Sequence, residues 1–206
     1  IDGHRQTVTV VPDGDGFTRN SDTQHACADP DGAGEAGAFR VAIAHSMHKV
    51  RRSGPVLDGL MTRRVKLDAA RDETESFQLV VIPTGGSLKG VRVESSPLAG
   101  PGGTIPIWWN RVGYVETAEP CYPTAYVGWW PDPLMPAGAF DVAADRVQPL
   151  WFTVDAGADT ASGVYRGNVV IEAAGQRSSV PVTARVRNFS LPRPGTLAAP
   201  FGVYKG

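Results

Sequence analysis

The clearest pattern in this chain is a strict alternation of apolar and more polar residues in its last third. Residues 150–155, 169–173 and 180–187 place an apolar side chain at every second position. A turn at Ala174-Gly175-Gln176 joins the last two of these segments. Period two with one polar face predicts a half-buried antiparallel hairpin, and Pro181 within it indicates an edge position or a bulge.

Shorter apolar runs predict further strands in the first two thirds of the chain. They lie at residues 7–11, 39–43, 65–67, 77–82, 91–93, 105–109 and 112–115. Residues 12–37 and 118–146 are instead rich in turn-forming residues without periodicity, and are predicted to be long loops. No stretch has a sustained helical period. The fold class predicted is therefore all-β, an antiparallel β-sandwich of about eight to ten strands with long loops.

Composition narrows the function classes. The 206 residues are 42% hydrophobic, with 24 Gly and 17 Pro, which suits a turn-rich β domain with a sizeable core. Lys+Arg 20 against Asp+Glu 21 leaves no basic excess, so no nucleic-acid partner is predicted. No apolar run approaches the roughly 18 residues of a membrane span. The chain also lacks phosphate-binding and dinucleotide-binding glycine motifs, and no cofactor is predicted.

Neither the cysteines nor the histidines define a metal site. Cys27 and Cys121 would pair in an exported protein, or remain two separate thiols. Residues 13–22 have part of a calcium-loop spacing but lack the first ligand. His45 and His48 lie near a strand end, where a three-residue spacing does not converge on a metal ion. We predict no metal site.

A charged cluster precedes the apolar run at residues 77–82. Arg71, Asp72, Glu73 and Glu75 form either a catalytic acid/base group, with both glutamates on one strand face, or a structural ion cluster at the strand start. Structural ion pairs produce the same pattern. We therefore prefer the structural interpretation for Arg71, Glu73 and Glu75, and predict no catalytic residue.

Two tryptophan pairs have two interpretations. Trp129 and Trp130 lie in a Gly/Pro-rich loop with Asp132, and Trp108 and Trp109 form the second pair. Exposed indoles beside a carboxylate make a sugar site. Alternatively, because adjacent strand residues face opposite ways, one Trp of each pair is core and the other covers a domain interface. Interface packing is the preferred interpretation.

Six motifs in order carry a family resemblance. They are A-R-x-E-x-E-S-F-Q at 70–78, G-Y-V at 113–115, G-x-x-P-D-P-L-x-P at 128–136, Q-P-L-W at 148–151, G-x-Y-x-G at 163–167 and F-x-L-P at 189–192. Together they resemble the N-terminal β-sandwich domain of glycoside hydrolase family 123 and its uncharacterised relatives, over residues 46–206. Residues 1–45 match no pattern of that family.

The resemblance implies a β-sandwich packed on a (β/α)8 catalytic barrel. Characterised members of the family cleave N-acetylgalactosamine glycosides by substrate-assisted catalysis, with an Asp–Glu pair on the barrel. None of those barrel positions occurs in these residues. The chain alone is therefore expected to lack glycosidase activity, although its parent protein is expected to be a glycoside hydrolase.

The resemblance also divides the chain. Residues 1–45 are expected to form an irregular N-terminal segment with one or two strands packing on the sandwich, and residues 46–191 the sandwich itself. Residues 192–206 are expected to be a linker and the first strand of the barrel, which would be the partner domain. Leu134 and Tyr204, with the tryptophan loop and Asp132, are predicted to face the substrate or the barrel. A secreted or periplasmic location is expected.

Two other functions remain open. One is an autonomous carbohydrate-binding module, and the other is a structural, immunoglobulin-like interaction domain. Glycan affinity of the isolated chain would separate the first from the rest. A large exposed apolar face around Trp129 and Tyr204 would favour a domain that braces the barrel.

Overall fold

A computed structural model describes residues 37–53, 64–123 and 126–191. These residues form twelve strands and no helix, so none of the described segments is a helix that could span a membrane. The strands are β1 (Phe39–His45), β2 (Val65–Arg71), β3 (Glu73–Pro83), β4 (Leu88–Ser95), β5 (Leu98–Gly100), β6 (Gly103–Ile105), β7 (Ile107–Glu116), β8 (Trp129–Met135), β9 (Phe140–Val142), β10 (Gln148–Ala156), β11 (Gly163–Ala173) and β12 (Gln176–Ser190).

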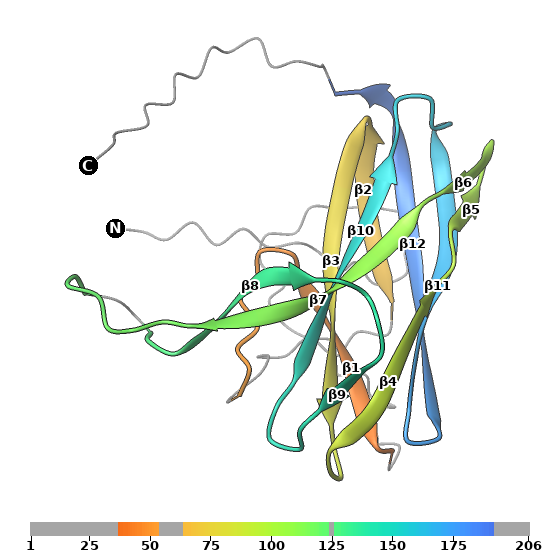
Figure 1. Cartoon of the computed structure of the whole chain (residues 1–206). Helices are drawn as coiled ribbons and strands as arrows, with labels where there is room; N and C mark the ends of the chain where they lie inside the picture. The colour runs from red at the N-terminus through yellow and green to blue at the C-terminus, as the bar shows by residue number, and fades with distance from the viewer. Residues whose placement is uncertain (1–36, 54–63, 124–125, 192–206) are drawn as a thin grey trace, which may run out of the picture.

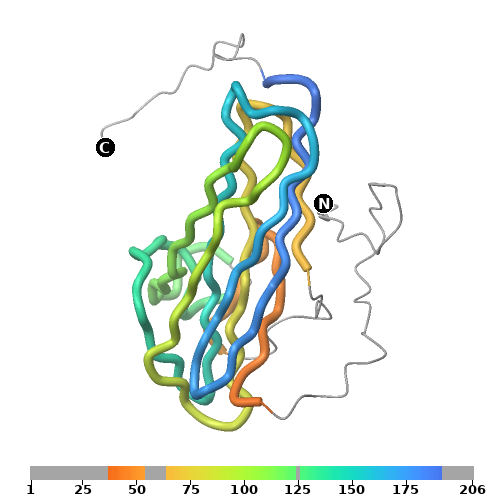
Figure 2. The backbone as a smooth tube through the Cα atoms, turned by 90° about the vertical axis from the view of Figure 1, so that its right-hand side faces the viewer, coloured from red at the N-terminus to blue at the C-terminus, as the bar shows by residue number. Residues whose placement is uncertain are grey.

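The strands form two sheets packed face to face, which confirms the predicted sandwich (Figures 1 and 2). One sheet has the order β1-β3-β10-β7-β8, and the other has the order β2-β12-β11-β4-β9, with β5 and β6 paired beside β11. Three of the twelve strands, β5, β6 and β9, have only three residues, too few to show a period.

One strand pair departs from the antiparallel prediction. β2 pairs with β12 in parallel, with Val65 opposite Val182. The chain leaves β2 through Asp72, whose φ of 66° turns it directly into β3 of the opposite sheet. Because β2 is not joined to β12 by a hairpin, its direction is set by this crossing between sheets.

The hairpin predicted from alternation is the longest pairing in the fold. β11 and β12 pair from Gly163–Val186 to Ala173–Gln176. The turn residues Ala174 and Gly175 have φ of 50° and 75°, the left-handed pair of a tight two-residue hairpin turn. Pro181 lies one residue before the point where β2 begins to pair, so the strand is locally an edge there, as predicted.

The core lies between the two sheets. Phe77 on β3 and Phe152 on β10 stack with their ring centroids 5.1 Å apart. Ile171 and Val182 from the opposite sheet are buried in the same cluster. The alternation of Leu150, Phe152 and Val154 is thus the inward face of a central strand.

The prediction of a loop at 118–146 was wrong in part, because β8 and β9 lie inside it. Pro131, Pro133 and Pro136 hide the strand pattern, and β8 tolerates two of these prolines since it is an edge strand with neighbours on one side. The prediction of two strands at 105–109 and 112–115 was also wrong. β6 ends before Pro106, and a single strand, β7, covers the rest of this stretch.

Several predictions fall outside the described residues. These are the strand at 7–11, the loop at 12–36, Cys27, the linker at 192–206 and Tyr204. Cys121, the possible partner of Cys27, is exposed.

Candidate functional site

Strands β7 and β8 extend away from the sandwich as a long hairpin (Figure 1). β7 pairs with β10 only through Ile107–Arg111, and its outer half pairs with β8 alone. We call β7, β8 and the described residues between them the arm. In this outer half, neither β7 nor β8 pairs with another strand of the sandwich. Exposed side chains there can therefore contact other surfaces.

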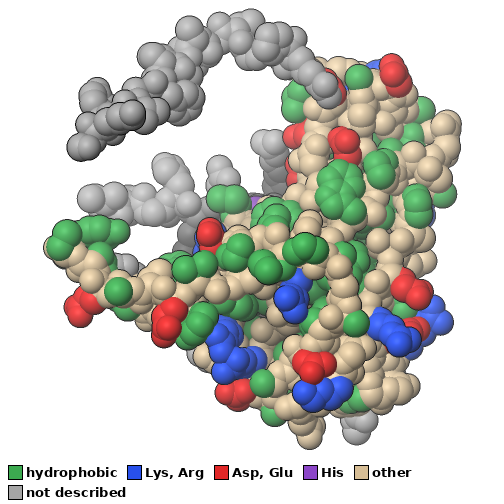
Figure 3. Space-filling model, viewed as in Figure 1, with side chains coloured by type: hydrophobic (Ala, Val, Ile, Leu, Met, Phe, Trp, Pro, Cys, Tyr) green, Lys and Arg blue, Asp and Glu red, His purple; other side chains and the backbone are tan. Residues whose placement is uncertain are grey.

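Exposed large apolar side chains concentrate on the arm, where they appear green in Figure 3. Of the ten such residues in the described part of the chain, seven are on the arm. They are Trp108, Val115, Tyr122, Val127, Trp129, Leu134 and Met135. Exposed large apolar side chains gathered on one hairpin in this way mark an interaction site rather than ordinary surface.

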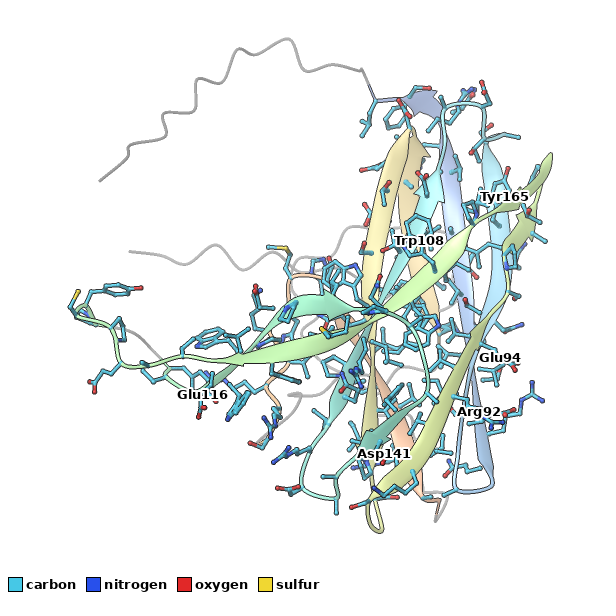
Figure 4. The ribbon with its side chains drawn as sticks, viewed as in Figure 1. Arg92, Glu94, Trp108, Glu116, Asp141 and Tyr165 are labelled. Atoms are coloured by element: carbon cyan, nitrogen blue, oxygen red, sulfur yellow. The ribbon has the colours of Figure 1, made fainter. Side chains whose placement is uncertain are left out.

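The tryptophan pair at the base of the arm follows the predicted division. Trp108 is 44% exposed and lies on the outer side of the sheet (Figure 4). Trp109 points inward and packs its ring against Phe140 and Phe152, with centroids 6.4 and 6.5 Å away. One residue of this pair is therefore core and the other is exposed.

The second tryptophan pair does not follow that division, because β8 is an edge strand that contributes no residue to the core between the sheets. Trp129 is 37% exposed, and the Arg52 guanidinium lies 4.2 Å from its ring centroid. Trp130 packs edge-to-face on Tyr126 at 5.4 Å, and its Nε1 donates to the Tyr126 carbonyl at 3.3 Å. Both indoles are held by arm and loop residues rather than by the sandwich.

Three residues of the predicted substrate or interface site, Trp129, Asp132 and Leu134, line two different hollows, and Trp130 lines neither. Asp132 and Leu134 border a small hollow of about 190 Å³, together with His48, Gln78 and Trp151. Trp129 borders the larger hollow described next. The sequence motif placed these residues close in the chain, but the strand turns them to different surroundings.

The larger hollow has a volume of about 550 Å³ and lies beneath the arm. Four basic residues line it, each from a different segment: Arg52, Lys89, Arg111 and Arg146. Asp141, labelled in the lower part of Figure 4, is the one acidic residue among the described residues that line this hollow. We call it the basic hollow. Sequence reasoning missed it because no local spacing joins these positions.

Hydrogen bonds settle the charge of the acidic residue. Asp141 accepts from Lys89 Nζ at 2.8 Å and from the Gly90 amide at 2.8 Å. These two bonds, that from Lys89 first, lower the pKa of Asp141, so it stays ionised and its charge is matched by Lys89.

A hydrogen bond fixes Tyr114, one of the two aromatic residues that line the basic hollow. The Tyr114 hydroxyl donates to the Val50 carbonyl at 3.1 Å. Burial raises the pKa of Tyr114 and the nearby Arg52 charge opposes the shift only in part, so the phenol remains neutral. Tyr114 therefore holds the segment that carries Arg52 against the arm.

The charged cluster at the start of β3 is tied to backbone and amide groups. Arg71 Nη2 donates to Asn188 Oδ1 at 2.5 Å, and Glu73 Oε2 accepts from the Ala70 amide at 2.6 Å. These contacts brace the crossing from β2 to β3. Burial, with repulsion from Glu73 second, raises the pKa of Glu75.

Two motif glutamines, which the sequence prediction did not single out, hold neighbouring segments. The buried Gln78 donates from Nε2 to the carbonyls of His45 and His48, at 2.8 and 2.9 Å. Gln148 donates from Nε2 to the Val112 carbonyl at 2.8 Å. A polar residue in an otherwise apolar strand was the signal that could have found them, because buried amides need partners.

Comparison with known proteins gives the family. The family model "Glycoside hydrolase 123 N-terminal domain" matches residues 46–173, more than half of the chain. The fold is similar to that of a family 123 glycoside hydrolase from Clostridium perfringens, solved in a study of glycolipid glycan hydrolysis, with a TM-score of 0.56 and 12% identity. That match covers 76% of this chain and 28% of the other chain. No curated protein matched.

These findings define first an N-terminal domain whose described residues form an all-β fold with a projecting arm. The chain belongs to the family of N-terminal domains of glycoside hydrolase family 123. The expectation drawn from the six sequence motifs is thereby confirmed at the level of the family.

Proposed function

We propose that this chain is the non-catalytic domain that braces the catalytic domain of a glycoside hydrolase. Its family is one of N-terminal domains, and it corresponds to 28% of the length of the matched family 123 enzyme. The family resemblance further suggests N-acetylgalactosamine glycosides as the substrates of the parent enzyme.

The observation that carries the proposal is the apolar surface of the arm. Val115 and Leu134 are 46% and 47% exposed on a hairpin whose second strand, β8, contributes no residue to the core between the sheets. A hairpin with this much exposed apolar surface is marginally stable in water unless a second surface covers it. The catalytic domain of the same polypeptide is the proposed cover, and it would reach the arm at high effective concentration.

The test is a charge placed in the middle of this surface. Leu134→Asp should change the unfolding free energy of the isolated chain by less than about 0.5 kcal/mol, because the side chain is exposed. In the parent protein the same change should uncouple the two domains, since a buried, unpaired carboxylate opposes docking. Calorimetry should then show two separate unfolding transitions in place of coupled unfolding.

The matched control is Ala99→Asp on β5. It also converts an exposed apolar residue into a carboxylate, but on the opposite sheet from the arm. It should leave interdomain coupling intact. Unchanged coupling in Leu134→Asp would contradict the proposal that the arm is the docking surface.

A further inference from the structure

The basic hollow concentrates positive charge that the rest of the fold does not neutralise. It contains four cations and one carboxylate, in a chain whose formal net charge is -1. Lys89 is paired with Asp141. Arg146 approaches Asp145 at 3.9 Å, but both side chains are exposed, so that pairing is weak. The excess charge is carried by guanidinium groups.

Arg111 is the central cation of this set. It lies on β7 opposite Leu150 of β10 and Met135 of β8, so both flanking strands fix its backbone. Its side chain is partly buried, and its guanidinium makes no hydrogen bond or ion pair with the described residues. A guanidinium without a partner among the described residues is available to receive a carboxylate or sulfate in bidentate geometry.

An aromatic ring borders the same hollow. Trp129 remains 37% exposed although Arg52 lies over its ring. The indole offers an apolar surface to the C–H face of a sugar, while the guanidinium groups offer donors to an anionic substituent. A hollow of about 550 Å³ falls within the size range of small-ligand sites.

We propose that the basic hollow binds an acidic sugar unit, with Arg111 and Arg146 on its anionic group and Trp129 against its ring. The shared chemistry is one anionic group on a pyranose ring, either a carboxylate or a sulfate ester. The choice of a saccharide as the carrier rests on the proposed function in a glycoside hydrolase. The domain would then contribute affinity for acidic glycans to an enzyme whose chemistry takes place elsewhere.

The experiment titrates the isotope-labelled 206-residue chain with matched sugars and follows backbone amide signals by NMR. Methyl glucuronide is compared with methyl glucoside, and glucose 6-sulfate with glucose, so that each pair differs only in the anion. Inorganic sulfate is the probe for an anion without a ring. Both acidic sugars should shift signals of residues 111–114, 129 and 141–147 and should bind more weakly as salt is raised.

The variants test the residues that the proposal uses. Arg111→Gln should weaken binding of the acidic sugars by about tenfold or more, because it removes charge-assisted hydrogen bonds. Arg146→Gln should also weaken binding. Because Arg146 lies in an exposed turn, this variant should fold normally and tests the proposal even where Arg111→Gln does not fold. Arg92→Gln, an exposed position on β4 outside the hollow, is the control and should bind as the wild type does (Figure 4).

Three results would overturn the proposal. They are equal binding of acidic and neutral sugars, wild-type affinity in both Arg111→Gln and Arg146→Gln, and binding of neither acidic sugar. Because the assay uses the isolated chain, any of these results would leave domain docking by the arm untouched.

Discussion

Gly113 on β7 lies directly against Pro133 on β8. A Cβ atom built on Gly113 would stand 2.8 Å from the Pro133 Cγ, closer than side-chain carbons approach each other. The two residues come from separate family motifs, G-Y-V and P-D-P-L. The strand register between Val112 and Tyr114 shifts at this point, which bends the hairpin. The two motifs are therefore two sides of one contact that shapes the arm.

Gly113→Ala should destabilise the chain by about 1–3 kcal/mol, since it forces an extra methyl group into a filled contact. Denaturant unfolding at fixed temperature measures the change. Gly138→Ala is the control, because no atom lies within 4 Å of the added methyl group. Adding Pro133→Ala to Gly113→Ala should recover part of the loss. Equal effects of Gly113→Ala and Gly138→Ala would show that the contact is not tight.

Gln78→Leu should destabilise the chain by about 1–3 kcal/mol, because it strips a donor from the carbonyls of His45, Ser46 and His48. Limited proteolysis should then cut near residues 45–50, which this side chain holds. Unchanged cutting there would mean that the backbone of the segment is fixed by other contacts.

Gln148→Leu is the matched comparison for that experiment. It removes the hydrogen bond to the Val112 carbonyl on the other side of β10. It should lower the unfolding free energy without opening residues 45–50. Both variants should lose stability, because each removes a hydrogen-bonding amide. Only Gln78→Leu should expose residues 45–50 to the protease, so the site of cutting separates its specific effect from the general one.

Glu75→Gln should stabilise the chain at pH 7. Burial raises the folded pKa of Glu75 above the value of about 4.3 for an exposed glutamate, so ionisation opposes folding. This cost is absent below the unfolded pKa and is fully present above the folded pKa. The advantage of the variant should therefore disappear near pH 4. Glu94→Gln, at an exposed position on β4, is the control, and a pH-independent difference for Glu75→Gln would contradict the assignment.

The sequence predicted the parts of the fold that have a two-residue period. β10, β11 and β12 alternate because one face of each is buried in the core. β8 escaped prediction because it is an edge strand that contributes no residue to the core between the sheets, so proline is tolerated there and alternation is not imposed. Periodicity reports the burial of one face in the core, which β8 lacks.

The same reasoning explains the candidate sites. The apolar side chains Trp129 and Leu134 were found because they lie in one motif. The basic hollow was not found, since Arg52, Lys89 and Arg111 are brought together only by the packing of separate strands and loops. Their role depends on tertiary geometry, which has no signature in local spacing.

Docking of the catalytic domain on the arm would be visible in the hydrogen exchange of the arm itself. Pro131, Pro133 and Pro136 have no amide, so the informative amides in residues 126–136 are the remaining ones. Their exchange should be compared in the isolated chain and in the parent protein with its catalytic domain. Residues 176–187 of β12, which pair with β11 as far as Val186 and with β2 from Val182 to Val186, serve as the internal reference.

We expect markedly slower exchange of the arm amides in the parent protein, with no change at residues 176–187. A docked domain removes water from the arm and suppresses its local opening. Equal exchange of residues 126–136 in both proteins would show that the catalytic domain does not cover the arm.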